Sequence, residues 1–268
     1  MAIDKSQKFI TLVRLGYAAR GLTYILLGTL ALGTSGKERD GAQGAFDYLQ
    51  DLPLGTPLLW ILALGLFAYA VFKLLCGAAN LENHDSDAMG MAKRIGELAS
   101  GTIHLFLAYA AYKFATGGQS SSAGEGGGQD MAQPVMDFEL GALLIGLAGL
   151  GMLASAVMQA KHAATGDFMK HIAGHAPKAV EGIGRAGYAA RAVVFGIIGW
   201  SLVRGAWLNS EGAVKGLGEA LLSLRDNGAV YTLVAIGLLL FGAFSLVTAR
   251  YRIIPDFARG DLKPGLSR

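Results

Sequence analysis

The stretch that decides the fold of this 268-residue chain is a short motif that occurs twice almost unchanged. It reads RLGYAARG at residues 14–21 and RAGYAARA at residues 185–192, and an eroded copy, RIGELASG, occupies residues 94–101. A long apolar stretch follows each copy. Self-similarity at regular spacing indicates tandem structural repeats, so the chain is predicted to contain three copies of one unit.

Each unit is predicted to contain two transmembrane helices. A helix needs about 20 mainly apolar residues to cross a bilayer. The stretches that meet this are residues 12–33, 58–76, 95–115, 138–160, 186–207 and 229–249. The composition agrees, because 53% of the residues are hydrophobic and 16% are charged, against roughly a quarter charged in soluble domains. We therefore expect an all-α integral membrane bundle of six transmembrane helices.

The spans divide the chain into repeats of the same orientation. They occupy residues 1–82, 83–172 and 173–252, and residues 253–268 form a tail. Because every repeat crosses the membrane twice, the three copies are parallel, and an axis along the membrane normal relates them. This predicts one membrane domain with pseudo-threefold symmetry.

Lysine and arginine set the predicted orientation. They concentrate before the first span, in the loops after the second and fourth spans, and in the tail. Positive residues collect on the cytoplasmic side. Both termini are therefore expected in the cytoplasm.

Two of the outward-facing connections are predicted to be short amphipathic helices at the membrane surface, at residues 44–49 and 216–222. The glycine-rich stretch at residues 117–128 lacks the Gly-Lys-Ser/Thr ending of a phosphate-binding loop, so it is interpreted as a flexible linker.

The repeated motif and the apolar span after it resemble the bacterial domain-of-unknown-function 1206 family. The resemblance covers nearly the whole chain, although the second copy departs from the pattern at Glu97 and Ser100. It implies a multi-pass protein of the bacterial inner membrane, and it supplies no activity.

Polar residues of the motif are the candidate site. Helical spacing places Arg20 and Tyr17, and likewise Arg191 and Tyr188, on one stripe that should face other helices. The second copy places Glu97 and His104 there. One interpretation is that Arg20, Arg191 and Glu97 converge, with Glu97 neutralising one arginine and leaving a positive site for an anion, to which the tyrosines and His104 add donors. The alternative, which we favour, is that Glu97 is a structural counter-ion between repeats.

Other polar residues are interpreted more simply. His104 is expected to be a hydrogen-bonded interior histidine and not a proton relay. Lys73 is expected to reach toward the headgroups, with a buried charge partner as the alternative. His171 and His175, four residues apart, would share a helix face, but this is weak evidence for a metal site, and none is predicted.

No catalytic motif, cofactor motif or nucleic-acid-binding patch is present in the sequence, and Cys76 is the single cysteine. A non-enzymatic function is therefore predicted, with membrane lipids as partners. One class is a channel or carrier for an anion or small polar solute. The other is an accessory or scaffold subunit that binds another membrane protein or lipids. Neither the cargo nor the oligomeric state follows from the sequence.

Overall fold

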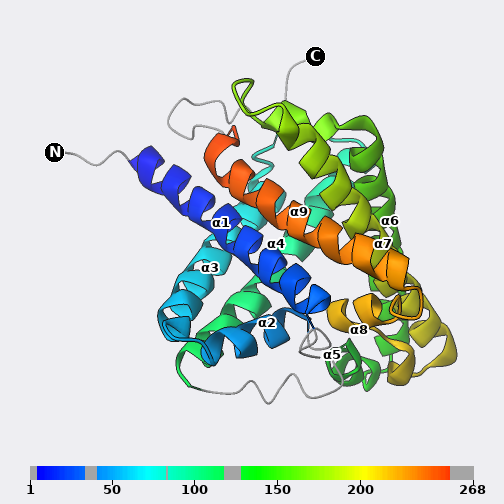
Figure 1. The fold of residues 1–268 in the computed structure, drawn as a ribbon. Coiled ribbons are helices and arrows are strands. Elements are labelled where there is room, and N and C mark those ends of the chain that lie inside the picture. Colours follow the sequence, from blue (N-terminus) through cyan, green and yellow to red (C-terminus); the bar gives the residue numbers. More distant parts are fainter. Residues whose placement is uncertain (1–4, 34–40, 83, 118–127, 254–268) are drawn as a thin grey trace.

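The computed structural model describes residues 5–33, 41–82, 84–117 and 128–253, and over these ranges the chain is almost entirely helical (Figure 1). The predicted linker and tail lie largely outside these ranges. The long helices are α1 (Lys5–Leu32), α3 (Gly55–Ala79), α4 (Ala88–Ala115), α6 (Gly141–Thr165), α7 (Ala179–Leu208) and α9 (Gly228–Tyr251). The short ones are α2 (Gly41–Gln50), α5 (Gly128–Met136), α8 (Leu217–Leu222) and the 3₁₀ turns η2 (Asp167–His171) and η3 (Glu211–Ala213).

Five of the described helices are long and apolar enough to cross a membrane, namely residues 10–32 of α1 together with α3, α6, α7 and α9. The remaining long helix, α4, lies where the third span is predicted, but Glu97 and His104 make it less apolar. The all-α class and a membrane protein with several spans are confirmed. A sixth crossing stays a prediction.

Polar side chains and left-handed residues set several helix ends. Asp87 accepts a hydrogen bond from the Gly90 backbone N–H at 2.7 Å and so caps the first turn of α4. Asn80 ends α3 with φ 52°, and Gly166 ends α6 with φ 68°. Asparagine and glycine tolerate this left-handed conformation best, so the local sequence stops each helix where the chain must turn.

A short helix follows the first long helix of every repeat. Helices α2, α5 and α8 lie toward the same end of the molecule (Figure 1). The predicted helices at residues 44–49 and 216–222 are confirmed as α2 and α8. Helix α5 was not predicted, because the glycine-rich stretch before it dominated the interpretation of that connection.

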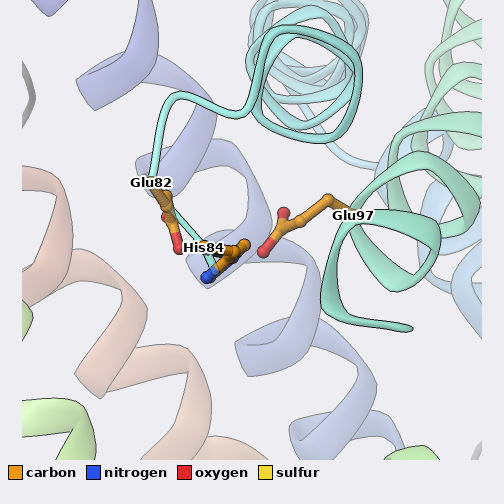
Figure 2. Close-up of side chains that lie close together, drawn as sticks. All are labelled: Glu82, His84 and Glu97. Carbon is orange, nitrogen blue, oxygen red and sulfur yellow. Dashed lines mark ion pairs between the residues drawn. The ribbon is translucent and has the colours of Figure 1, made fainter. Parts of the chain in front are cut away.

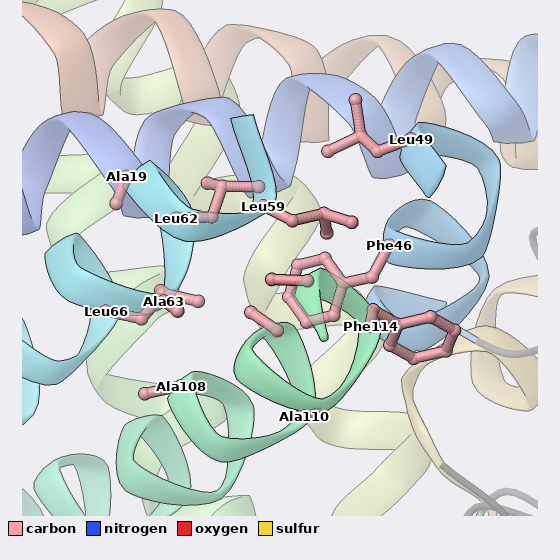
Figure 3. Packing of buried hydrophobic residues seen from close by; sticks show 12 residues of the cluster. Ala19, Phe46, Leu49, Leu59, Leu62, Ala63, Leu66, Ala108, Ala110 and Phe114 are labelled. Atoms are coloured by element: carbon pink, nitrogen blue, oxygen red, sulfur yellow. The ribbon is translucent and has the colours of Figure 1, made fainter. Parts of the chain in front are cut away.

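Helix α2 packs into the bundle through its apolar face. Phe46 and Leu49 are buried against Leu59 of α3, and the Phe46 ring lies 6.3 Å from the ring of Phe114 on α4 (Figure 3). The Gln50 amide donates a hydrogen bond to the Phe114 carbonyl at 3.1 Å. These contacts join the end of α4 to the first repeat.

The long helices pack in the spatial order α4–α3–α1–α9–α7–α6. Within the first repeat α1 packs on α3, and within the third repeat α7 packs on α9. Between repeats, α3 packs on α4, α6 on α7 and α1 on α9 (Figure 1). Helices α1 and α9 run antiparallel, since the Tyr231 hydroxyl near the start of α9 donates to the Ala31 carbonyl at the end of α1 at 2.6 Å.

The motif glycines permit the same close contact in the first and third repeats. A Cβ added to Gly16 would lie 2.8 Å from the Cα of Tyr69, and one added to Gly187 would lie 2.7 Å from the Cα of Phe241. Small residues at these points let the helix backbones approach closely. Tyr69 and Phe241 therefore occupy corresponding positions.

The second repeat lacks this contact. Helices α4 and α6 share no extensive interface in the described part of the chain. A Cβ added to Gly96, the motif glycine of this repeat, or to Gly151 of α6 would meet no described atom within 4 Å. The helix order is therefore open between α4 and α6.

Candidate functional site

Arg20, on α1, lies at the meeting point of three helices. Its guanidinium donates hydrogen bonds to the Tyr69 hydroxyl of α3 at 2.5 Å and to the Ser245 hydroxyl of α9 at 3.1 Å. Its Cζ lies 4.8 Å from the centroid of the Tyr17 ring and 5.1 Å from that of Phe241. Aromatic faces attract the cation, and the two hydroxyl oxygens accept hydrogen bonds from its N–H groups. Arg20 is therefore bound without a carboxylate.

Arg191, on α7, contacts the same Phe241 ring. Its Cζ lies 4.3 Å from that centroid, 4.6 Å from the centroid of Phe195 and 5.5 Å from that of Tyr24. Within the described residues no side chain forms a hydrogen bond or ion pair with it, and its Nε is buried without a partner. The structure thus brings Arg20 and Arg191 to one ring, as the sequence predicts.

The two motif tyrosines lie close to these arginines but have different surroundings. The ring of Tyr17 lies 5.1 Å from the ring of Tyr69, and Arg252 lies over its face at 5.1 Å. The ring of Tyr188 lies 5.1 Å from the ring of His162 and 5.4 Å from that of Phe241. Both therefore pack within the bundle next to cationic or imidazole side chains.

His104, on α4, joins this aromatic group from the other side. Its ring lies 4.6 Å from the ring of Tyr69, and its Nδ1 lies 2.7 Å from the Ser100 carbonyl. That carbonyl can only accept, so Nδ1 carries the proton and donates. This is the contact that a hydrogen-bonded interior histidine requires.

Glu97 does not pair with an arginine, which corrects the anion-site interpretation, whereas its pairing with Lys73 of the first repeat agrees with the alternative of a counter-ion between repeats. Its Oε2 lies 2.5 Å from the Nζ of Lys73, with both side chains largely buried. Lys73, expected to reach the headgroups, instead has the buried charge partner that was its alternative role. The reason is that α3 packs directly on α4, so the lysine meets a carboxylate before it meets the membrane surface.

Glu97 also faces a pair of side chains from the loop after α3. Glu82 and His84 project from that loop toward Glu97 (Figure 2), and their donor atoms lie within 4.8 Å of one another. The Asn80 side chain holds the loop by bonding both the N–H and the carbonyl of His84 at 2.9 Å. Arg252, just past α9, forms an ion pair with Glu82.

The charges in this cluster are balanced. Although burial pushes the pKa of Glu82 upward, Lys73 and Arg252 hold it below its ordinary value. The two carboxylates are thus matched by two cations. A divalent metal ion between Glu82 and Glu97 would leave two uncompensated positive charges in a poorly solvated place, so the arrangement does not favour one.

The other histidines do not share a helix face. His171 ends η2, and the chain then turns before His175, whose ring lies 5.4 Å from that of Tyr251. His162 bonds to Asp167, which lowers the pKa of that carboxyl against the effect of burial. The helix that would put both histidines on one face does not form, because η2 ends at His171.

Several partners in this network were not singled out in the sequence. Tyr69, Ser245, Phe241 and Arg252 belong to the second helix of a repeat or to the segment after it, where no motif repeats. A lone charged residue in an apolar stretch was the sequence feature that could have pointed to such a partner. Lys73 has this feature, but these four residues do not.

Apolar helices of membrane-spanning length around a buried polar network define a multi-pass membrane protein. The family described as Domain of Unknown Function (DUF1206) matches residues 15–79, 95–166 and 186–252, so the chain belongs to this family in three tandem copies. It is also 30% identical over 250 residues to the uncharacterized protein YxxB of Bacillus subtilis (strain 168), covering 89% of this chain and 90% of the relative. No solved structure matches it.

Proposed function

We propose that this protein is a non-enzymatic channel or carrier of the bacterial inner membrane that binds a small anion between Arg20 and Arg191. The proposal includes six spans, with α4 crossing beside α3, and both termini in the cytoplasm. An even number of crossings agrees with the start of α1 and the end of α9 lying at the same end of the bundle (Figure 1).

A pseudo-threefold arrangement is part of this proposal. The contacts of α1 with α9, α3 with α4 and α6 with α7 recur in the same sense around the bundle. A Cβ on Gly28 would lie 3.0 Å from the Ala235 carbonyl, and one on Gly199, at the corresponding position of the third repeat, 3.0 Å from the Gly149 carbonyl. Three equivalent interfaces would lie around a central path that is open on one side, between α4 and α6.

The observation that carries the proposal is the positive charge at the Phe241 ring. Arg20 and Arg191 both lie over it, and neither has a carboxylate partner among the described residues. The nearby carboxylates Glu82 and Glu97 are already paired. An unpaired arginine inside a bilayer costs at least about 2.5–3.5 kcal/mol, and a bound anion would offset that cost.

Flux into liposomes tests the proposal. Vesicles containing the protein should pass at least one of chloride, acetate and phosphate faster than protein-free vesicles. Arg191→Gln should slow the flux at least about ten-fold, because it removes one of the two charges. Arg250→Gln removes an exposed charge from the end of α9 and should leave the flux unchanged. Rates equal to those of empty vesicles for all three anions would rule transport out.

An accessory or scaffold role is the second candidate, and the open side of the second repeat favours it. Gly96 and Gly151 present uncovered small-residue surfaces, and α6 exposes Leu143, Leu147 and Leu150. A transmembrane helix of another protein could pack there. Mass spectrometry of protein gently extracted from its own membrane tests this, and a chain that is always recovered alone counts against it.

A further inference from the structure

We infer that the ligand of Arg191 is an oxoanion, that is, a carboxylate or phosphate group held by the edge of the guanidinium, and not a halide. This rests on the proposed anion site and specifies the chemistry it selects. The inference follows from a comparison of Arg191 with Arg20, its counterpart in the first repeat.

Arg20 obtains its acceptors from two defined positions. One is Tyr69, on the second helix of its own repeat, and the other is Ser245, on the neighbouring repeat. Gly16 packs on Tyr69 as Gly187 packs on Phe241, so Phe241 holds the position of Tyr69 in the third repeat. Phenylalanine has no hydroxyl. Arg191 therefore lacks the acceptor that Arg20 has.

Among the described residues, no side chain of the neighbouring repeat forms a hydrogen bond with Arg191 either. Helix α6 packs antiparallel on α7, with the space beside Gly149 filled by Val203 and that beside Gly199 by Leu153. If the pairing of Leu153 with Gly199 is continued along the two antiparallel helices for two turns, Gln159 of α6 comes within about one turn of Arg191 of α7. The Gln159 Oε1 and the Arg191 Nε are both buried without a partner in the described residues. The side chains at this level thus leave hydrogen-bonding capacity for a ligand.

The aromatic neighbours decide which part of the guanidinium is available. Tyr24, Phe195 and Phe241 all lie within 5.5 Å of its Cζ, where ring and guanidinium attract each other. Its N–H groups point outward in the guanidinium plane and form a fork that matches two oxygens of one group. A carboxylate or phosphate accepts two parallel hydrogen bonds there, whereas a halide offers one centre and no direction.

The charge and the amide both suit such a ligand. The two arginines supply a positive excess that one or two negative charges neutralise. The side-chain amide of Gln159 can present either its oxygen or its NH₂ group, so it can bond a hydroxyl of the ligand or a further oxygen. The Nε of Arg20 is also buried without a partner, but its two terminal nitrogens donate to the Tyr69 and Ser245 hydroxyls, and Arg191 has no such partners among the described residues.

The test is ligand-dependent thermal unfolding of the full chain in detergent. Sodium phosphate, acetate and chloride are compared at equal ionic strength. Phosphate and acetate should stabilise the protein and chloride should not. Arg191→Gln should weaken the apparent affinity about ten-fold or more, and Arg250→Gln should leave it unchanged. Phe241→Tyr restores the hydroxyl found at Tyr69, so it should weaken the affinity several-fold while the free protein becomes more stable.

Two outcomes overturn the inference: equal stabilisation by chloride, or full phosphate and acetate binding in the Phe241→Tyr variant. The latter variant keeps the test decisive if Arg191→Gln fails to fold. Nanodiscs of phosphatidylglycerol and of phosphatidylcholine distinguish the source of the group. If an anionic lipid headgroup already fills the site, added phosphate should stabilise the protein in phosphatidylcholine but not in phosphatidylglycerol. If the ligand is a soluble anion, added phosphate should stabilise it in both. If phosphate and acetate bind but do not cross the liposome membrane, the proposed transport function is wrong and the inference of an oxoanion ligand stands.

Discussion

Lys73 of α3 and Glu97 of α4 form a largely buried ion pair, with Nζ and Oε2 2.5 Å apart, across the boundary between the first and second repeats. The pair joins α4, the long described helix that is not among the five apolar enough to cross a membrane, to the bundle. Removal of either partner would leave an uncompensated charge where water is scarce.

Glu97→Gln should therefore destabilise the protein by about 3–5 kcal/mol, because Lys73 stays buried without its partner. The double variant Lys73→Met with Glu97→Met should recover most of that loss, since it removes both charges together. Thermal unfolding in detergent measures both effects. Glu139→Gln, at an exposed position, is the matched control. A double variant as unstable as the single one would contradict the explanation by charge.

The motif glycines should respond differently in different repeats. Gly187→Ala places a methyl group against the backbone of Phe241 and should cost about 1–3 kcal/mol from overpacking. Gly96→Ala enters open space and should instead gain up to about 1 kcal/mol from helix propensity. Unfolding midpoints of the two variants give the comparison. A large loss of stability in Gly96→Ala would mean that α4 is covered by another surface.

Tyr69→Phe should make Arg20 resemble Arg191. The ring and its packing on Gly16 remain, but the hydroxyl that accepts from the guanidinium is lost. A lost hydrogen bond to a charged group costs about 1.5–3 kcal/mol, which thermal unfolding would detect. Tyr48→Phe, on a half-exposed ring of α2, should change nothing. A Tyr69→Phe protein of wild-type stability would show that Ser245 alone suffices for Arg20.

Because of Glu82, the free energy of unfolding should depend on pH. Burial alone would raise its pKa, but Lys73 and Arg252 lower it below the ordinary value of 4.5. A carboxyl whose pKa is depressed in the folded state stabilises the protein above its unfolded pKa, and that stabilisation is lost as the pH falls through the folded pKa. The stability difference between wild type and Glu82→Gln should thus be constant above about pH 5.5 and shrink below about pH 4.5.

The same comparison isolates Glu82 from other groups. Burial, with help from Arg252, also lowers the pKa of His171, which adds a dependence near neutral pH. His171 contributes to the unfolding free energy of both the wild type and Glu82→Gln. Its contribution therefore cancels when one free energy is subtracted from the other, as long as Glu82 does not change the pKa of His171. A difference that grows with acid would contradict the assigned ion pair with Arg252.

Local sequence predicted the positions of the long helices and the faces on which Arg20 and Arg191 lie, and both arginines contact the Phe241 ring. Both depend on the spacing of residues along one helix, and that spacing repeats visibly at residues 14–21 and 185–192. The predicted crossing by α4 is not among the five spans found, because its polar residues make this helix less apolar than a membrane span requires.

The partners of the site residues could not be predicted in the same way. Whether Lys73 reaches the headgroups or meets Glu97 depends on which helix packs beside α3, and spacing along the chain does not specify that neighbour. The difference between Tyr69 and Phe241 was likewise visible in the sequence, but its meaning depends on knowing that both occupy the same position against a motif glycine.

The Lys73–Glu97 pair also has a consequence for how the protein is made. In the proposed six-span arrangement, α4 would be inserted with the Glu97 carboxylate near the start of its apolar stretch, and a charge inside a bilayer is costly. Helix α3 leaves the ribosome first and brings the compensating lysine. If α4 enters the bilayer beside α3, the two helices would enter with their charges already paired, so the lysine of the earlier helix would help the later one to insert.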